Sequence, residues 1–340
     1  MALRDMSEWV KERTFEKSQE LLKGAIDIHV HAGPHLKSSP RSADPVQVAI
    51  QARDAGMRAL VYMDVFEMTT GTAWIVSRVV PDFQVFGGIM LNTVYGGLNP
   101  RAVKTAIFYG SGARYVSFGA CSTVYQASKE GRVFEDGKFR LLKDVYPKFV
   151  EEELSRCISI PIESKLSPQL QEILETVAAN PQVILNTGHV SPAETFRLID
   201  LAKEYGIKKV LVANAVVANM TIEEMKRAGK AGAYLERTLA AHTHTTSIPK
   251  THYYVEPEWR VLDEGLPGHI SGGVKMIADQ IQEVGPEHFI LGTDFGVYTL
   301  PTPVEGMREF IACMLDLEFS EDDVRMMTST NPAQLLGLQD

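Results

Sequence analysis

The sequence has 340 residues, which suffices for one large α/β domain or for two smaller domains, and we favour one. Its 45 % hydrophobic and 23 % charged residues are typical of soluble globular proteins. No apolar stretch reaches the roughly 18 residues that a membrane span needs. The net charge of -9, without clustered Lys and Arg, argues against a nucleic-acid partner. We therefore expect neither a membrane nor a nucleic acid as partner.

The first 24 residues are charged throughout and lack the apolar core of a signal peptide. They predict an N-terminal helix over 1–24. The three cysteines, Cys121, Cys157 and Cys313, are odd in number and widely spaced, which favours reduced thiols over a disulfide framework. We expect a cytoplasmic protein.

After this helix, short β-rich runs alternate with longer helical patterns, which indicates βα units. Eight runs are predicted to be strands: 25–31, 58–65, 84–91, 113–119, 182–189, 209–215, 233–239 and 289–296. Eight strands each followed by a helix predict a (β/α)₈ barrel, which we assign to residues 25–340. Such barrels carry their active sites at the C-terminal ends of the strands.

Two insertions interrupt this rhythm, over residues 120–164 and 240–272. Both are expected to lie above the catalytic face, because both follow the C-terminal end of a strand. In the first insertion, the segment RVFEDGKFRLL predicts a hairpin around Asp136 and Gly137.

The first strand carries two histidines in the segment AIDIHVHAGPH. Side chains alternate between the faces of a strand, so Asp27, His29 and His31 are expected on one face, with the apolar residues between them facing the helices. Two imidazoles at this spacing can chelate one divalent ion. A lone His-x-His pair also has a purely structural interpretation, so further ligands are needed.

Two further candidate ligands end other predicted strands. His189 ends the fifth strand in LNTGHVS, and Asp294 ends the eighth in LGTDFG. Three imidazoles and one carboxylate at the same end of a barrel suit a divalent ion with an open position for water. Four unrelated polar residues are the weaker alternative, because the spacing and the position of these residues are independent observations.

Together with the closing SEDDVRMMTSTNPAQLLGL, these motifs resemble the amidohydrolase superfamily, in particular its small barrels without an additional β-sandwich domain. The resemblance spans roughly residues 25–338. It implies a metal-dependent enzyme with His29, His31, His189 and Asp294 as ligands, and with Asp294 also as the base that takes a proton from the attacking water. The segment FGGIMLNTVYGGLNPRAV resembles one family within the superfamily, from which no substrate follows.

The sequence departs from the superfamily at two positions. In the superfamily the sixth strand often ends in a histidine, whereas Asn214 stands at this position. Asn214 is a candidate catalytic residue, because an amide can still hydrogen-bond, although it cannot transfer a proton at neutral pH. The fourth strand lacks the carboxylated lysine or glutamate of two-metal members, and Cys121 beyond it is more typical of a small buried hydrophobe than of a ligand. We therefore predict one divalent ion, Zn²⁺ before Mn²⁺ or Fe²⁺.

Several other residues are secondary candidates. His242 and His244 follow the seventh strand and could act as acids or contact substrate, with solvated loop residues as the alternative. Glu236 and Arg237 are neighbours on that strand, so at most one enters the barrel. If Arg237 does, it could bind a substrate carboxylate, and an outward salt bridge is the alternative. His35 is expected to be a solvated loop residue.

The sequence thus predicts a metal-dependent hydrolase that cleaves a C–N or C–O bond of a small amide, cyclic amide, lactone or ester. The first alternative is a metal-dependent lyase, a decarboxylase or hydratase acting on a small carboxylic acid. The second is a barrel that binds a metal or ligand without turnover. The insertions carry no motif that identifies the substrate, and association into a homo-oligomer stays open.

Overall fold

A computed structural model describes residues 12–35, 40–129, 132–135, 138–141, 144, 147–240, 271–298 and 300–338. In this part of the chain, eight parallel strands form one sheet in the order β1-β2-β3-β4-β7-β8-β9-β10. Their bounds are β1 (Ile26–Val30), β2 (Ala59–Tyr62), β3 (Gln84–Met90), β4 (Ala113–Ser117), β7 (Ile184–Asn186), β8 (Val210–Val212), β9 (Tyr234–Thr238) and β10 (Phe289–Gly292).

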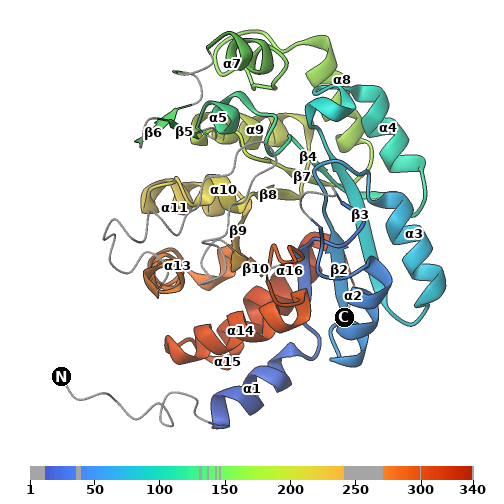
Figure 1. The fold of residues 1–340 in the computed structure, drawn as a ribbon, viewed down its shortest axis with the longest axis vertical. Coiled ribbons are helices and arrows are strands. Elements are labelled where there is room, and N and C mark those ends of the chain that lie inside the picture. Colours follow the sequence, from blue (N-terminus) through green and yellow to red (C-terminus); the bar gives the residue numbers. More distant parts are fainter. Residues whose placement is uncertain are drawn as a thin grey trace.

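The first and last strands of this order meet and close the sheet. Val30 forms a parallel bridge with Phe295. The His31 N–H donates to the Phe295 carbonyl at 2.8 Å, and the Asp294 N–H donates to the His29 carbonyl at 2.8 Å. The predicted (β/α)₈ barrel is therefore confirmed (Figure 1).

Helices connect the strands and cover the outside of the barrel (Figure 1). The principal ones are α2 (Pro45–Asp54), α3 (Thr70–Val79), α4 (Pro100–Phe108), α8 (Pro168–Ala178), α9 (Pro192–Tyr205), α11 (Ile222–Lys230), α13 (Ser271–Val284) and α14 (Pro303–Asp316). Shorter ones are η2 (Thr93–Tyr95), α10 (Asn214–Val217), η5 (Pro286–His288), α15 (Glu321–Arg325), η6 (Met326–Thr330) and α16 (Asn331–Leu336). Many begin at a capped residue followed by proline. At α9, for example, Ser191 and Glu194 form a reciprocal capping box.

The buried apolar residues form two clusters. The larger lies between the strands and the surrounding helices and includes Leu60 and Leu291 beside Ala49 and Met307. The smaller joins alternate strand residues to α16 and contains none of the surrounding helices, so it fills the inside of the barrel. Each buried aliphatic side chain contributes about 1.5–3 kcal/mol, and the barrel therefore holds the strand ends rigidly.

The strict alternation that the sequence predicts for β1 is wrong. Ile26 and Ile28 belong to the inner cluster, whereas Val30 belongs to the outer one. The register of β1 against β2 shifts between Asp27 and Val30. A bulge inserts one residue into a strand and changes which face the following side chains occupy.

Asp27 consequently does not share a face with His29. Its buried carboxylate accepts the backbone N–H of His29 and that of Thr293, each at 3.1 Å, and also the Thr293 hydroxyl. Asp27 therefore fastens the end of β10 to β1, and the two histidines after the bulge are free to converge inside the barrel.

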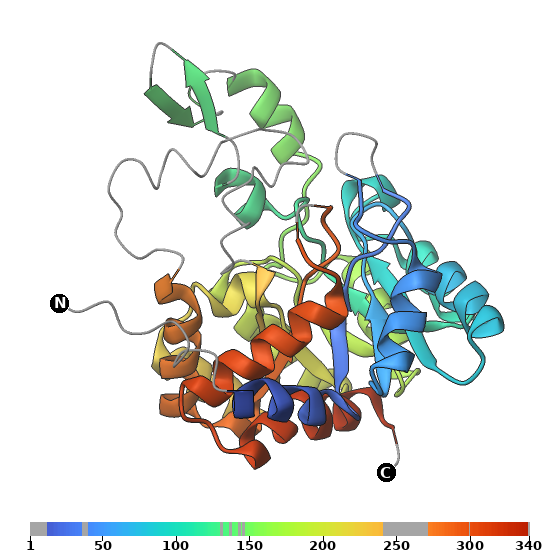
Figure 2. The ribbon, with the colours of Figure 1, turned by 60° about the horizontal axis from the view of Figure 1, so that its bottom comes forward.

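The insertion after β4 contains α5 (Val124–Lys129), β5 (Arg132–Glu135), β6 (Lys138–Leu141) and α7 (Pro147–Leu154). The two strands pair antiparallel, which confirms the predicted hairpin. Figure 2 shows these elements standing above one end of the barrel. The second predicted insertion lies almost entirely outside the described residues, which lack 241–270.

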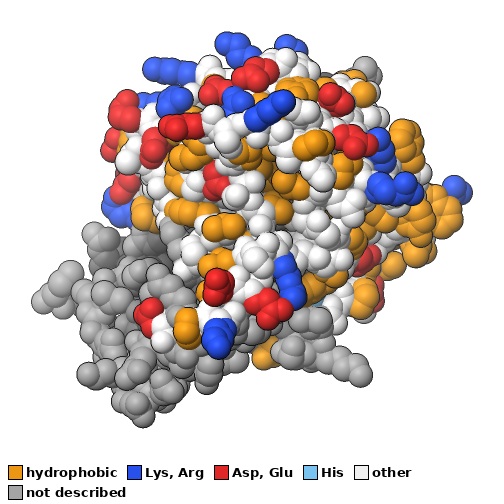
Figure 3. Space-filling model, turned by 90° about the horizontal axis from the view of Figure 1, so that it is seen from above, with side chains coloured by type: hydrophobic (Ala, Val, Ile, Leu, Met, Phe, Trp, Pro, Cys, Tyr) orange, Lys and Arg blue, Asp and Glu red, His pale blue; other side chains and the backbone are white. Residues whose placement is uncertain are grey.

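At the opposite end of the barrel lies α1 (Glu12–Leu22) (Figure 2). It packs against α14 and buries Leu21 and Leu22. No helix among the described residues is long and apolar enough to cross a membrane. On the face shown in Figure 3, acidic and basic side chains are interspersed, so the described part of this face offers no continuous basic surface.

Candidate metal centre

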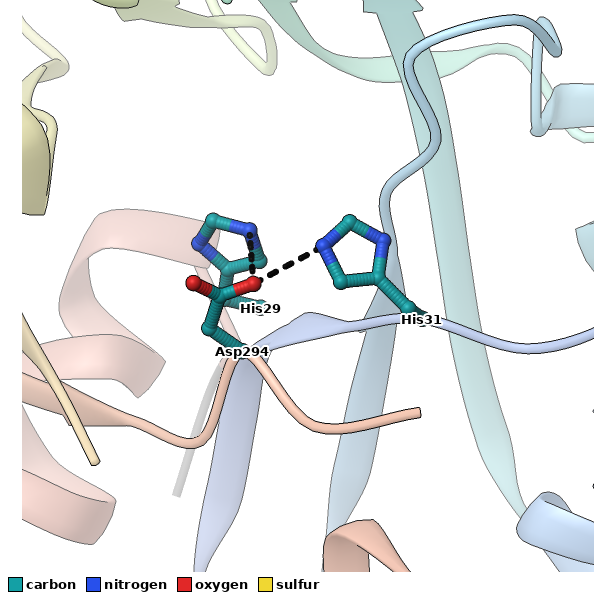
Figure 4. A group of neighbouring side chains, drawn as sticks. All are labelled: His29, His31 and Asp294. Atoms are coloured by element: carbon teal, nitrogen blue, oxygen red, sulfur yellow. Dashed lines mark hydrogen bonds and ion pairs between the residues drawn. The ribbon is translucent and has the colours of Figure 1, made fainter. Parts of the chain in front are cut away.

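Three predicted ligands converge at the carboxyl ends of β1 and β10. The Asp294 Oδ1 lies 2.9 Å from His31 Nε2 and 3.5 Å from His29 Nε2. Figure 4 shows the two rings and the carboxylate pointing toward a common position. One donor atom from each residue lies within 4.8 Å of the other two, so these residues could hold a metal ion. The structure thus brings together ends of the chain that the sequence places far apart.

The backbone around Asp294 is unusual. Asp294 has a φ of 56°, in the left-handed region that Asp and Asn enter more readily than other residues with a side chain. At Gly296, an added Cβ would lie 2.0 Å from the His31 carbonyl oxygen. The chain after β10 therefore runs directly against the second histidine, and only glycine fits there.

Both histidines are held from behind by hydrogen-bond acceptors. The His31 Nδ1 donates to the Met63 carbonyl at 2.7 Å. The His29 Nδ1 lies 2.9 Å from Oε1 of Glu236, a wholly buried carboxylate on β9. Because these partners are acceptors, each Nδ1 carries hydrogen, which leaves Nε2, the nitrogen that faces Asp294, as the atom whose lone pair could bind a metal when the ring is neutral.

The electrostatics of the two rings differ. Burial alone lowers the pKa of His29, but the nearby Glu236 and Asp294 carboxylates outweigh it and raise that pKa to about 9. Burial lowers the pKa of His31, and the neighbouring Arg41 lowers it further. Two ring nitrogens and a carboxylate oxygen thus surround one position that favours a cation.

The fourth predicted ligand, His189, lies at the same end of the barrel but outside this group of three. Its backbone N–H donates to the Gly119 carbonyl at 2.9 Å, and the preceding Gly188 has a φ of 60°. Burial lowers the pKa of its ring to about 4, so the ring is neutral at pH 7. Within the described part of the chain, its buried Nδ1 has no hydrogen-bond partner.

These observations fit a divalent ion. Neutral imidazoles and a carboxylate are the donors that Zn²⁺, Mn²⁺ and Fe²⁺ bind in proteins. The unpartnered His189 nitrogen is a buried polar atom that a ligand would satisfy, since such atoms are rare in folded proteins. His29, His31 and Asp294 would hold the ion. The pKa of His189 responds to the charges of Asp294 and His29, but its ring lies outside this group, so its role as a ligand stays a prediction.

Asn214 has a structural task. Its backbone N–H donates to Glu236 Oε2 at 3.0 Å, and its side-chain Oδ1 accepts the N–H of Thr238 at 3.2 Å. The amide oxygen is therefore occupied by the neighbouring strand.

Glu236, not Arg237, is the residue of this pair that enters the barrel. Leu235 belongs to the outer cluster, so strand alternation places Arg237 on the outer face as well. Its guanidinium is buried, and none of its nitrogens has a hydrogen-bond partner among the described residues. The proposed contact of Arg237 with substrate stays a prediction that this geometry does not support.

Three further candidates, His242, His244 and Cys121, are not placed in the group of convergent donors. His242 and His244 lie outside the described residues. Cys121 is partly buried beyond β4, and it is not part of the group of possible ligands found in the described chain.

Beside the site lies a buried polar cluster, His35, Arg41 and Asp64, that the sequence analysis did not predict. His35 is not a solvated loop residue: its side chain is 0 % exposed and its Nδ1 lies 3.0 Å from Asp64 Oδ2. The buried Arg41 guanidinium lies 3.4 Å from the same oxygen. Burial raises the pKa of the Asp64 carboxyl, but the hydrogen bonds from His35 and from the Phe66 N–H outweigh it and lower that pKa to about 2. The signal in the sequence was a charged residue, Asp64, just beyond the end of β2.

The fold and the convergent donors define a (β/α)₈ barrel with a candidate metal centre. The model of a family described as "Family of unknown function (DUF6282)" matches residues 24–236. The chain belongs to this family. No curated protein matches the sequence.

Solved structures share the fold over nearly the whole chain. A proposed 2-pyrone-4,6-dicarboxylic acid hydrolase from Pseudomonas putida is 14 % identical with a TM-score of 0.52, over 93 % of this chain and 98 % of that one. A zinc-bound amidohydrolase from Burkholderia multivorans is 12 % identical, with a TM-score of 0.51 over 93 % and 99 % of the two chains. A 2,6-dihydroxybenzoate decarboxylase is 11 % identical, with a TM-score of 0.51 over 93 % and 100 %. The resemblance to amidohydrolases that the motifs predict is confirmed for the fold.

Proposed function

We propose that the protein is a metal-dependent hydrolase that cleaves a C–N or C–O bond of a small molecule. The observation that carries this proposal is the convergence of His29 Nε2, His31 Nε2 and Asp294 Oδ1, with both Nδ1 atoms held by acceptors. A bound divalent ion, Zn²⁺ before Mn²⁺ or Fe²⁺, supplies a Lewis acid that polarises a carbonyl and lowers the pKa of water.

The residues of the chain have distinct tasks in this proposal. His29, His31, His189 and Asp294 would hold the ion. The Asp294 carboxylate takes the proton of the attacking water, and its side chain is 29 % exposed, the most accessible of the convergent group. Asn214 contributes no proton, since it is an amide whose oxygen accepts the Thr238 N–H. His242 and His244 remain secondary candidates for an acid.

A lyase is the second candidate, and one observation favours it. The sixth strand supplies an amide in a structural role, so no acid or base has been found among the described residues of that strand end. A reaction in which a carboxylate leaves as CO₂ requires fewer proton-transfer groups than an amide hydrolysis. The decarboxylase with the same fold is compatible with such chemistry, although its likeness concerns the fold alone.

Elemental analysis of the purified protein tests the metal centre. We expect about one Zn²⁺, Mn²⁺ or Fe ion per wild-type chain, and far less in His189→Ala, because a missing ligand weakens a site severely. His288→Ala is the matched control, since this histidine lies on η5, outside the candidate ligands. If the wild-type protein contains no bound ion after metal supplementation, the proposed metal centre is refuted.

Product analysis separates the two candidate reactions. The metal-loaded protein is offered a panel of amides, cyclic amides, lactones, esters and small carboxylic acids. New carboxylate and amine or alcohol groups support hydrolysis, whereas release of CO₂ or a change in double bonds supports the lyase. Inactivity of the loaded protein toward the whole panel would favour a barrel that binds without turnover.

A further inference from the structure

Glu236 is a buried carboxylate that joins the candidate metal centre to the neighbouring strand. It lies on β9, and its side chain is 1 % exposed. Its Oε1 lies 2.9 Å from His29 Nδ1, and its Oε2 accepts the backbone N–H of Asn214 at 3.0 Å. Both oxygens therefore face donors, which is what an ionised carboxylate needs when it is removed from water.

The arrangement fixes which nitrogen of His29 carries hydrogen. An ionised carboxylate only accepts, so the Nδ1 beside Glu236 must be the protonated nitrogen. The opposite nitrogen, Nε2, then has a free lone pair in the neutral ring and faces Asp294 at 3.5 Å. His31 receives the same constraint from a neutral group, the Met63 carbonyl. The two histidines thus differ in the charge of the acceptor behind them.

We propose that Glu236 is a positioning residue that holds His29 in the Nδ1–H tautomer and so presents its Nε2 to a divalent ion. This inference rests on the proposed metal centre and deepens it. A negatively charged acceptor behind the ring also makes Nε2 more basic, and a more basic nitrogen binds a divalent cation more strongly.

Asn214 completes the support. Its N–H fixes the second oxygen of Glu236, while its amide oxygen accepts the Thr238 N–H on the strand that carries Glu236. The two contacts of Asn214 therefore fix the side chain of Glu236 relative to the backbone of β9. The backbone N–H of Asn214 thus holds the carboxylate, while the side-chain amide is used in a contact with β9.

The carboxylate cannot be replaced by an amide without conflict. In Glu236→Gln one oxygen and one NH₂ group must face two donors, His29 Nδ1–H and Asn214 N–H. If the NH₂ faces His29, the ring must accept through Nδ1, its hydrogen moves to Nε2 and the metal-binding lone pair is lost. If the NH₂ faces Asn214, two donors oppose each other in a buried place.

The test compares Zn²⁺ binding by the wild-type protein, Glu236→Gln and a matched control, Glu224→Gln. Glu224 also accepts a backbone N–H, that of Thr221 at 2.8 Å, but it caps α11 away from the convergent donors. Zn²⁺ affinity is measured by competition with a chelator, and bound zinc is counted by elemental analysis. We expect roughly 10–100-fold weaker binding in Glu236→Gln, as for other hydrogen-bond partners of metal-bound histidines, and unchanged binding in the control.

Long-range ¹H–¹⁵N spectra of the zinc-loaded wild-type protein provide a readout that a merely structural role would not move. They report which ring nitrogen of His29 carries hydrogen, and they need no variant to fold. We expect hydrogen on Nδ1 and coordination through Nε2. Coordination through Nδ1, or equal zinc affinity in Glu236→Gln and wild type, would overturn the inference.

Two further outcomes separate this inference from the proposed function. If the wild-type protein holds two ions and Glu236→Gln loses one of them, Glu236 is itself a ligand and the positioning role is wrong. If the wild-type protein binds no zinc, the proposed metal centre is refuted, and this inference is refuted with it. Weaker zinc binding in Glu236→Gln without any hydrolysis by the wild type would leave the positioning role intact.

Discussion

His31 and Asp294 lie 263 positions apart in the sequence, yet His31 Nε2 is 2.9 Å from Asp294 Oδ1. Barrel closure brings them together, because β1 and β10 are the two ends of the strand order and meet through Val30 and Phe295. Asp27 then locks this seam by accepting donors of Thr293. The candidate centre therefore depends on the same contacts that close the barrel, so metal binding and stability are coupled.

Metal removal is expected to lower the melting temperature. An ion that binds only the folded state stabilises it by about 2.7 kcal/mol at a free concentration of 100 times Kd. Thermal unfolding is followed after treatment with a chelator and again after Zn²⁺ is restored. His31→Ala should show no such zinc-dependent increase, and an equal increase in that variant would contradict the assignment of His31.

Replacing Asp294 by Asn is expected to reduce turnover about 10²–10⁴-fold, because an amide cannot take the proton of the attacking water. Asn tolerates the left-handed backbone as Asp does, so the φ of 56° should persist without new strain. The measurement is kcat of metal-loaded protein on any substrate found by the panel, with circular dichroism as the check on folding. Turnover close to wild type would mean that another group is the base.

Asp64→Asn should destabilise the protein in a pH-dependent way. The folded-state pKa of Asp64 is about 2, below the ordinary value of 3.8, so its charged form stabilises the fold above pH 3.8 and this stabilisation is lost as the pH falls toward 2. The shift corresponds to about 2 kcal/mol at neutral pH. Urea unfolding of both proteins at about pH 7 and at about pH 2.5 measures the difference, which should shrink at the lower pH. A difference that is the same at both values would exclude this linkage.

Gly188→Ala is expected to be far more damaging than the same change at Gly206. Both residues have positive φ, 60° and 75°, so both substitutions carry a conformational cost of about 1 kcal/mol. At Gly188 the new Cβ would also lie 2.1 Å from the Gly119 carbonyl oxygen, whereas nothing lies within 4 Å at Gly206. We expect Gly188→Ala to cost at least about 2 kcal/mol more and to weaken metal binding through His189. Comparable urea midpoints for the two variants would show that the contact relaxes easily.

Local patterns in the sequence predicted most of the architecture. Buried parallel strands correspond to short apolar runs in the sequence, and helices correspond to periodic segments that begin at a capping residue. The eight strands, the hairpin of the first insertion and the barrel could therefore all be predicted. The predicted ligands could be proposed for the same reason, since strand ends in such a barrel share one face.

Contacts between distant segments decided the rest. The bulge that moves Asp27 away from His29 arises from the pairing of β1 with its neighbours, which no local pattern shows. Whether Glu236 or Arg237 enters the barrel depends on the register of β9, and the burial of His35 depends on Asp64 in the loop after β2. The sequence by itself determined which chemical groups stand at the strand ends, because periodicity is local. Only the tertiary structure decided which group stands behind each histidine, because hydrogen-bond partners are chosen by proximity in space.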